Sequence, residues 1–501
     1  MTRLSWLIAP VYLLGLSQAK PVDSHLITRG SKIEWKDCIL NKTQIIPTQC
    51  GKLKVPLDYS DSGNKKEVTL ELTRVEALKK PSKGTILMNF GGPGGPGRPE
   101  FASDMALTAL GLTGGEHDLV TFDPRGTGDT LTFSCFSNDL ERSLFTTGQY
   151  KPVAGAFPLA RGQNWATSEI FAEQCAAAQN ETGRFLGTSF VARDMMQIVD
   201  ALNEDGMLRY WGMSYGTYLG AVAAAMFTDK VDKMMLDGVV NPFDWRINYD
   251  IESFVDVDKT LSKFCQECVE AQDDCALAGD LDAEELEKKL YEFFDDIRLD
   301  PVVVKGTILD YNTVKVILYN DLKTPRKWRT TAKLLYGIME RDVKIIEAVF
   351  AELGGGGEAM TKESQFGIRC SDMTGQTDDI HDIIPLLDKR WDASRFAADV
   401  VEHIVMRCSR WKLPAAERYE GDFKVKTKNP MLVIGNTLDC ATPLESARNV
   451  TKTFEGARLL QFDIPGHTIL GRSSECIIKA TMDYWNEGKL PRVRVMVGLI
   501  D

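Results

Sequence analysis

One serine in this chain stands in a setting that suits a nucleophile. Ser214 is the centre of Gly212-Met-Ser-Tyr-Gly216, a G-x-S-x-G pattern between an apolar run and a helical pattern rich in small residues. A tight strand-to-helix turn presents such a serine above a sheet edge, and the small glycines let strand and helix approach. The Tyr215 backbone N–H, at the helix start, would face a negatively charged oxygen. We predict a nucleophile at Ser214 and an oxyanion donor at Tyr215; the alternative is a surface serine in a glycine turn.

A serine nucleophile needs a general base and an acid that orients this base. Of the five histidines, His467 alone follows the last predicted strand, and Asp439 closely follows the strand before it. This gives the chain order Ser…Asp…His. We predict His467 as the base and Asp439 as the acid, with Asp237, after an earlier strand, as the rival acid. The alternative for His467 is a structural histidine.

A glycine-rich loop at 90–97 also follows a predicted strand. Acyl transfer needs a second N–H beside the carbonyl oxygen, and glycine lets the backbone come close. We assign this donor to Gly92, within one residue. The spacing Gly92-x-Gly94-x-x-Gly97 also matches the dinucleotide-binding fingerprint. Two prolines inside the turn, and the lack of a clean helix after it, argue against that alternative.

A further loop, Asp123-Pro-Arg125-Gly-Thr-Gly128, follows another predicted strand. Arg125 near the mouth of an active site could bind a substrate carboxylate. Alternatively, Asp123 and Arg125 support the glycine loop through hydrogen bonds and charge pairing. We favour the supporting role.

These residues require a sheet whose strand ends meet at one edge. Strands alternate with helices, which predicts an α/β fold with a mostly parallel sheet. The region 246–424 is instead mainly helical, and an insertion over the strand ends would form a lid. We expect a catalytic core from 20–245 and 425–501 and a helical cap from 246–424. The strands are predicted at 68–77, 85–90, 118–122, 207–211, 233–240, 429–434 and 458–464, and helices at 190–202, 215–227, 281–299, 326–342, 343–353 and 382–406.

Composition excludes several classes of function. The chain has 501 residues, of which 44% are hydrophobic and 26% charged, with a net charge of −12. An acidic chain without a basic run is a poor partner for nucleic acid or an anionic membrane. Cys265-x-x-Cys268 lacks a second ligand pair at the spacing of a zinc site, so we predict no metal and no cofactor.

The first residues and the cysteines indicate the secretory pathway. Residues 1–19 combine a basic start, a short apolar run and a small-x-small site, which predicts a cleaved signal peptide rather than a membrane span. Eleven cysteines predict up to five disulfides and one free thiol. Spacing leaves their pairing open; we prefer Cys38/Cys50, Cys370/Cys408 and Cys440/Cys476. We expect glycosylation in the sequons at Asn41, Asn180 and Asn449, and a secreted or vacuolar protein.

Taken together, these motifs resemble the secreted α/β-hydrolases of the tripeptidyl aminopeptidase-like group, relatives of the prolyl aminopeptidases. The resemblance spans most of the mature chain. It implies Ser214, Asp439 and His467 as the catalytic triad, a cap that limits access to short substrates, and a fungal source. Two departures, Thr130 in place of a serine and Cys440 beside the acid, leave the triad untouched. The matching segments include 35–38, 55–59, 91–94, 123–128, 192–194, 212–216, 237–242, 370–372, 439–443, 466–467 and 488–491.

We therefore expect a serine hydrolase that acts through an acyl-enzyme, most simply a peptidase releasing short N-terminal peptides or single residues. The first alternative is an esterase or amide hydrolase of a small-molecule, secondary-metabolite pathway, since fold and triad do not choose between these substrates. The second is a catalytically idle binding ectodomain. Intact triad residues and both glycine loops argue against this last alternative.

Overall fold

A nine-stranded sheet forms the centre of the molecule. The computed structural model describes residues 32–42, 44–148, 157, 159–353, 362–471 and 474–492. In these residues the strand order is β1-β2-β3-β5-β4-β6-β7-β10-β11, antiparallel from β1 to β5 and parallel from there to β11. The bounds are β1 Lys36–Cys38, β2 Thr48–Pro56, β3 Glu67–Val75, β4 Thr85–Asn89, β5 Asp118–Phe122, β6 Leu208–Met213, β7 Val231–Asp237, β10 Leu432–Leu438 and β11 Arg458–Pro465.

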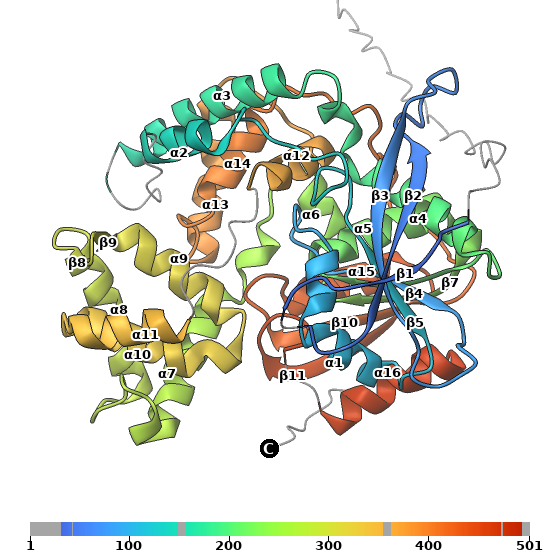
Figure 1. Ribbon diagram of the computed structural model, residues 1–501. Coiled ribbons are helices and arrows are strands. Elements are labelled where there is room, and N and C mark those ends of the chain that lie inside the picture. The colour runs from blue at the N-terminus through green and yellow to red at the C-terminus, as the bar shows by residue number, and fades with distance from the viewer. Residues whose placement is uncertain are drawn as a thin grey trace, which may run out of the picture.

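The mostly parallel sheet confirms the predicted fold class. Every residue of β4 and β6 is buried, because helices cover both faces of the central strands. Helices α1 (Met105–Leu112) and α16 (Glu475–Glu487) pack on one face. On the other face lie α4 (Thr188–Leu202), α5 (Tyr215–Met226) and α15 (Leu444–Thr453) (Figure 1). All seven predicted strands are present, whereas β1 and β2 were not predicted. The alternating burial of β2 is the signal that could have revealed it.

Two insertions build the helical part that stands beside the core in Figure 1. The first, between β5 and α4, was not anticipated and contains α2 and α3. The second lies between β7 and β10 and runs from α6 to α14 with a small hairpin, β8–β9. The bounds are α2 Asp139–Gly148, α3 Ala160–Ala178, α6 Pro242–Arg246, α7 Val257–Ala271, α8 Ala283–Ile297, β8 Val302–Val304, β9 Thr307–Leu309, α9 Tyr311–Leu322, α10 Trp328–Met339, α11 Val343–Glu352, α12 Lys362–Asp372, α13 Ile384–Ala393 and α14 Glu402–Ser409.

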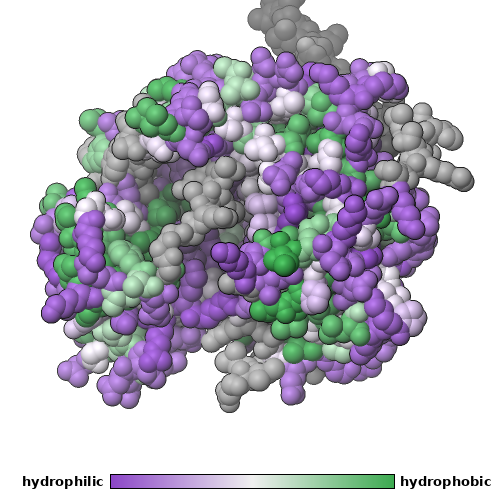
Figure 2. Space-filling view, in the orientation of Figure 1, coloured by the Kyte–Doolittle hydropathy of each residue, from purple (hydrophilic) through white to green (hydrophobic). Residues whose placement is uncertain are grey.

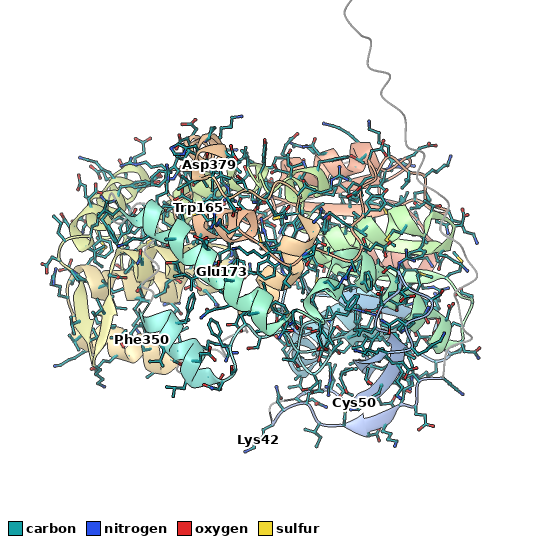
Figure 3. The ribbon with its side chains drawn as sticks, turned by 90° about the horizontal axis from the view of Figure 1, so that it is seen from above. Lys42, Cys50, Trp165, Glu173, Phe350 and Asp379 are labelled. Carbon is teal, nitrogen blue, oxygen red and sulfur yellow. A yellow bond between two sulfur atoms is a disulfide. The ribbon has the colours of Figure 1, made fainter. Side chains whose placement is uncertain are left out.

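Apart from α6, the helices of the two insertions form two groups. Helices α7 to α11, which we call the lateral lobe, have a hydrophobic core of their own. Helices α2, α3, α12, α13 and α14, the upper lobe, lie above it in Figure 1. In Figure 3, α3, marked by Trp165 and Glu173, crosses the view diagonally, with Phe350 of the lateral lobe and Cys50 of the core on either side below it. On the face seen in Figure 2, hydrophilic residues predominate and apolar ones form small groups. Within the described residues, no helix has the length and apolarity to cross a bilayer.

The predicted helix over 382–406 is two helices, α13 and α14, with a break at Ser394. Asp258 of α7 is the cause of this break. Its carboxylate accepts hydrogen bonds from the Ser394 hydroxyl and from the backbone N–H groups of Arg395 and Phe396, at 2.5, 2.9 and 3.2 Å. A partner on a distant helix thus overrides the local helical pattern.

Four disulfides join eight of the eleven cysteines. Cys38–Cys50 and Cys370–Cys408 are present as preferred, and Cys135–Cys175 and Cys268–Cys275 were not named. The expected Cys440–Cys476 pair is wrong. Cys440 is buried in the core of the lateral lobe, whereas Cys476 is exposed on α16, so their thiols are apart. Three thiols are therefore free, including Cys265. The glycine run at 354–357 lies outside the described residues.

Candidate active site

Ser214 lies in the sharp turn between β6 and α5. Its backbone angles, φ 54° and ψ −127°, are strained for a residue with a side chain. The turn needs glycine on both sides: a Cβ at Gly212 would lie 2.2 Å from the Gly216 carbonyl oxygen, and one at Gly216 would lie 2.5 Å from the Asn89 carbonyl oxygen. The Ser214 N–H donates to the Asp237 carbonyl oxygen at 3.0 Å, which ties the turn to the end of β7.

The glycine loop after β4 lies against this turn through Gly91. A Cβ at Gly91 would be 2.7 Å from the Ser214 Cβ and 3.0 Å from the Tyr215 nitrogen. The Gly91 N–H itself donates to Asn89 Oδ1 at 3.0 Å, so it is already used within the loop. The next N–H along the chain belongs to Gly92. Its role as the oxyanion donor stays a prediction.

His467 and Asp439 lie side by side at the same edge of the sheet. His467 Nδ1 is 2.7 Å from Asp439 Oδ2. The other bonds to this buried carboxylate come from the Ala441 and Thr442 N–H groups, at 2.8 and 2.9 Å, and from the Thr442 hydroxyl at 2.9 Å. With Nδ1–H directed at Asp439, Nε2 of the neutral ring is an acceptor, as a general base requires.

Two buried residues hold the loop that carries His467. Asn436 of β10 donates from Nδ2 to the carbonyl oxygens of Gly466 and Thr468, at 2.8 and 3.0 Å. Asp237 of β7, the rival acid, accepts the Ile469 N–H at 3.2 Å on each oxygen. Burial raises the Asp237 pKa to about 7. In this geometry Asp439 bonds the imidazole of His467. Asp237 bonds the backbone N–H of Ile469, two residues further along the chain.

The end of β7 lies against both Ser214 and His467. Gly238 directly follows Asp237, whose carbonyl bonds the Ser214 N–H, and a Cβ on Gly238 would lie 3.1 Å from His467 Cε1. The side chain of His467 is 17% exposed, so a substrate can reach it.

Arg125 does not face the site. It is fully buried, pairs with Asp194 at 2.6 Å and donates to the carbonyl oxygens of Pro56 and Leu57. Asp123 accepts the Arg98 N–H at 3.1 Å, directly after the glycine loop, and burial raises its pKa to about 6. These contacts favour the supporting role over binding of a substrate carboxylate.

Sequence patterns gave no role to three residues that contact the site directly or through one neighbour. Thr442 bonds both Asp439 and His467, the latter at 3.0 Å; it stood in the Asp439-x-x-Thr-Pro segment of the resemblance. Asp372 of α12 accepts the Thr188 N–H and hydroxyl at 2.8 and 2.6 Å, and this hydroxyl lies 2.5 Å from the Tyr215 hydroxyl. Lys323 contacts the histidine loop from the lateral lobe. Asp372 lay in the 370–372 segment of the resemblance, whereas no local signal marks Lys323, because its partner is distant in sequence.

The sequon asparagines differ in exposure. Asn41 and Asn180 are exposed. Asn449 is partly buried on α15 and donates from Nδ2 to Glu252 Oε1 at 2.6 Å, so its amide is engaged. Residues 1–19 and Thr43 lie outside the described residues. Among those described, no group of three or more His, Cys, Asp or Glu side chains is arranged to hold a metal ion.

Known proteins share these features. Residues 84–267 match the family model described as alpha/beta hydrolase fold, and residues 394–496 match the model described as TAP-like protein. The fold is thus that of the α/β-hydrolases, and the two matches cover the predicted nucleophile, acid and base.

Three curated relatives extend over most of the chain. A tripeptidyl aminopeptidase of Streptomyces coelicolor is 28% identical over 466 residues, covering 89% of this chain and 82% of its own. The serine protease Hip1 of Mycobacterium tuberculosis is 24% identical, with 92% and 90% covered. Carboxylesterase B of Mycobacterium tuberculosis is 25% identical, with 91% and 88% covered. These relatives are bacterial, whereas the resemblance implied a fungal source.

Proposed function

We propose that the chain is a serine peptidase that releases short peptides, tripeptides foremost, from the free N-terminus of its substrates. The carrying observation is the His467–Asp439 pair, 2.7 Å apart, at the sheet edge where the Ser214 turn lies. The similarity to a tripeptidyl aminopeptidase and to a serine protease over most of the chain supports the substrate class.

In this mechanism His467 Nε2 takes the proton of Ser214 as its oxygen attacks the substrate carbonyl. The N–H groups of Tyr215 and Gly92 stabilise the oxyanion, where one donor contributes about 10²- to 10³-fold in kcat. Asp439 fixes the imidazole tautomer and stabilises its charged form. His467 then gives the proton to the leaving nitrogen, the C–N bond breaks, and water hydrolyses the acyl-enzyme.

We also propose that the helical insertion over 246–424 acts as the cap, together with α2 and α3. A cap over the strand ends favours chain termini over internal segments of a folded protein. Secretion or delivery to a vacuole is part of the proposal, because four disulfides favour an oxidising compartment.

A second candidate is an esterase or amide hydrolase for small molecules. The similarity to carboxylesterase B favours it, since the same triad chemistry serves both substrate classes.

One assay separates these functions. Purified protein and a Ser214→Ala variant receive tripeptide anilides with a free amine, the same anilides N-acetylated, and a short-chain nitrophenyl ester. Cleavage of the free-amine peptides alone, lost in Ser214→Ala, supports the aminopeptidase. Ser214-dependent cleavage of the ester alone moves the assignment to the esterase. A fluorophosphonate that fails to label Ser214 would indicate the idle binding domain.

A further inference from the structure

A cavity of about 270 Å³ adjoins the predicted base on the side of the lateral lobe. Three parts of the chain line it: the core with Phe90, Glu100 and Met213, the lobe with residues 323–326, and the histidine loop with His467 itself. Phe90 is the first residue of the glycine loop, and Met213 directly precedes Ser214. The cavity therefore runs beside both catalytic loops.

The chemistry of the reaction indicates what this cavity can hold. His467 must deliver its proton to the leaving nitrogen, so the departing part of the substrate lies next to the imidazole. His467 lines the cavity, whereas Ser214 does not. The cavity is thus on the histidine side of the site, where the segment after the scissile bond departs.

The other charged side chains that line the cavity already have partners. Arg326 lies 3.7 Å from Asp104 at the exposed rim. Lys323 donates from Nζ to Asn320 Oδ1 at 3.1 Å and lies 4.5 Å from the centre of the Tyr319 ring.

Glu100 is different. It lies in the short helix η2 (Arg98–Ala102) and is partly buried. Within the described part of the chain, its carboxylate has no hydrogen-bond or ion-pair partner, and burial alone raises its pKa. A carboxylate that has lost part of its hydration without gaining a cation binds an incoming cation favourably.

We propose that Glu100 forms a cation subsite for the leaving group, so that the enzyme prefers a lysine or arginine directly after the scissile bond. This preference rests on the proposed function for peptide substrates. A neutral side chain fills the same space but leaves the carboxylate unpaired. We expect kcat/KM to be about tenfold higher for lysine than for a neutral side chain of similar length, the ratio of a single favourable ion pair.

The first test compares free-amine tetrapeptide amides that share three residues and end in lysine, norleucine or glutamate. Release of the fourth residue is followed by chromatography for the wild type, Glu100→Gln and the exposed lateral-lobe control Glu284→Gln. We expect the order lysine, norleucine, glutamate. In Glu100→Gln the lysine value should fall to that of norleucine, while norleucine cleavage stays within about twofold. Glu100→Asp should restore part of the preference, and thermal unfolding confirms that each variant is folded.

The second test does not require peptidase activity. It compares a choline ester with its uncharged 3,3-dimethylbutyl isostere, which share one acyl group. Preference for choline, lost in Glu100→Gln, supports the cation subsite even if no peptide is cleaved, in which case only the peptidase proposal fails.

Three results would overturn the subsite. The first is an equal rate for charged and neutral leaving groups in the wild type. The second is a preference for the charged leaving group that survives Glu100→Gln. The third is a KM that Glu100→Gln raises equally for every free-amine peptide, with esters unchanged, which would assign Glu100 to the substrate α-ammonium instead. A protein that cleaves neither series overturns both proposals.

Discussion

The backbone N–H of His467 donates a hydrogen bond to the carbonyl oxygen of Lys323, 2.8 Å away. Lys323 directly follows α9, so a backbone carbonyl of the lateral lobe holds the predicted base in place. Beside this bond, Gly466 packs on Pro325 so closely that a Cβ at Gly466 would lie 2.6 Å from Pro325 Cδ. The position of the imidazole therefore depends on how the lobe is docked.

Gly466→Ala should lower kcat about 10- to 100-fold, because the added methyl group displaces the histidine loop from Pro325. Gly456→Ala is the matched control: its φ is also positive, +83° against +108°, but its Cβ would meet no atom closer than 3.8 Å. Stopped-flow acylation with a free-amine anilide measures the effect. Equal losses in both variants would show that backbone strain alone is responsible.

Asp439→Asn should lower kcat by about 10⁴-fold with little change in KM, since the amide no longer enforces the imidazole tautomer. Asp237→Asn should cost far less, about tenfold at most, because its partner is the Ile469 backbone N–H rather than the ring. Steady-state kinetics on one substrate ranks the two variants. The opposite ranking would make Asp237 the triad acid.

Ellman's reagent should find one reactive thiol in the folded protein, Cys476, and two more after denaturation without reductant. Cys265 and Cys440 are buried, and burial raises the pKa of each thiol to about 12, so neither reacts in the native state. A peptide map with a Cys440–Cys476 disulfide, or a total of one free thiol, would contradict this pairing.

The buried Asp372 should make folding less favourable as the pH rises. Burial raises its pKa from 3.8 to about 7, so between about pH 4 and pH 7 the native state binds this proton and the unfolded state does not. Its contribution to the free energy of unfolding then falls by about 1.4 kcal/mol per pH unit in that window. Asp372→Asn lacks this titration. In urea unfolding, the free energy of unfolding of the variant relative to that of the wild type should rise from pH 4 to pH 7 and stay constant above pH 7.

Parallel stability curves for Asp372→Asn and the wild type would show that Asp372 does not titrate in this range. The variant also tests the contact to the predicted oxyanion donor, because Asp372 reaches the Tyr215 hydroxyl through Thr188. A change in kcat at pH 8, where the stability difference is constant, would report that link.

The sequence by itself determined seven strands of the nine-stranded sheet, the fold class and the candidate triad. Each depends on local chemistry: a buried strand requires a continuous apolar run, and the Ser214 turn requires Gly212 and Gly216 within two residues. Parallel strands end at one edge, so residues that directly follow them must meet there. Asp439 and His467 follow adjacent strands, β10 and β11, and they do meet.

Only the tertiary structure decided what depends on partners far along the chain. Asp258 breaks the helix at Ser394, and Arg125 pairs with Asp194 instead of facing a substrate. The same holds for the thiol of Cys440, which the lateral lobe buries away from Cys476. The sequence pattern records which residues are apolar or charged, but the identity of a contact follows from how the layers pack. For that reason the hold of Lys323 on His467 has no local signature.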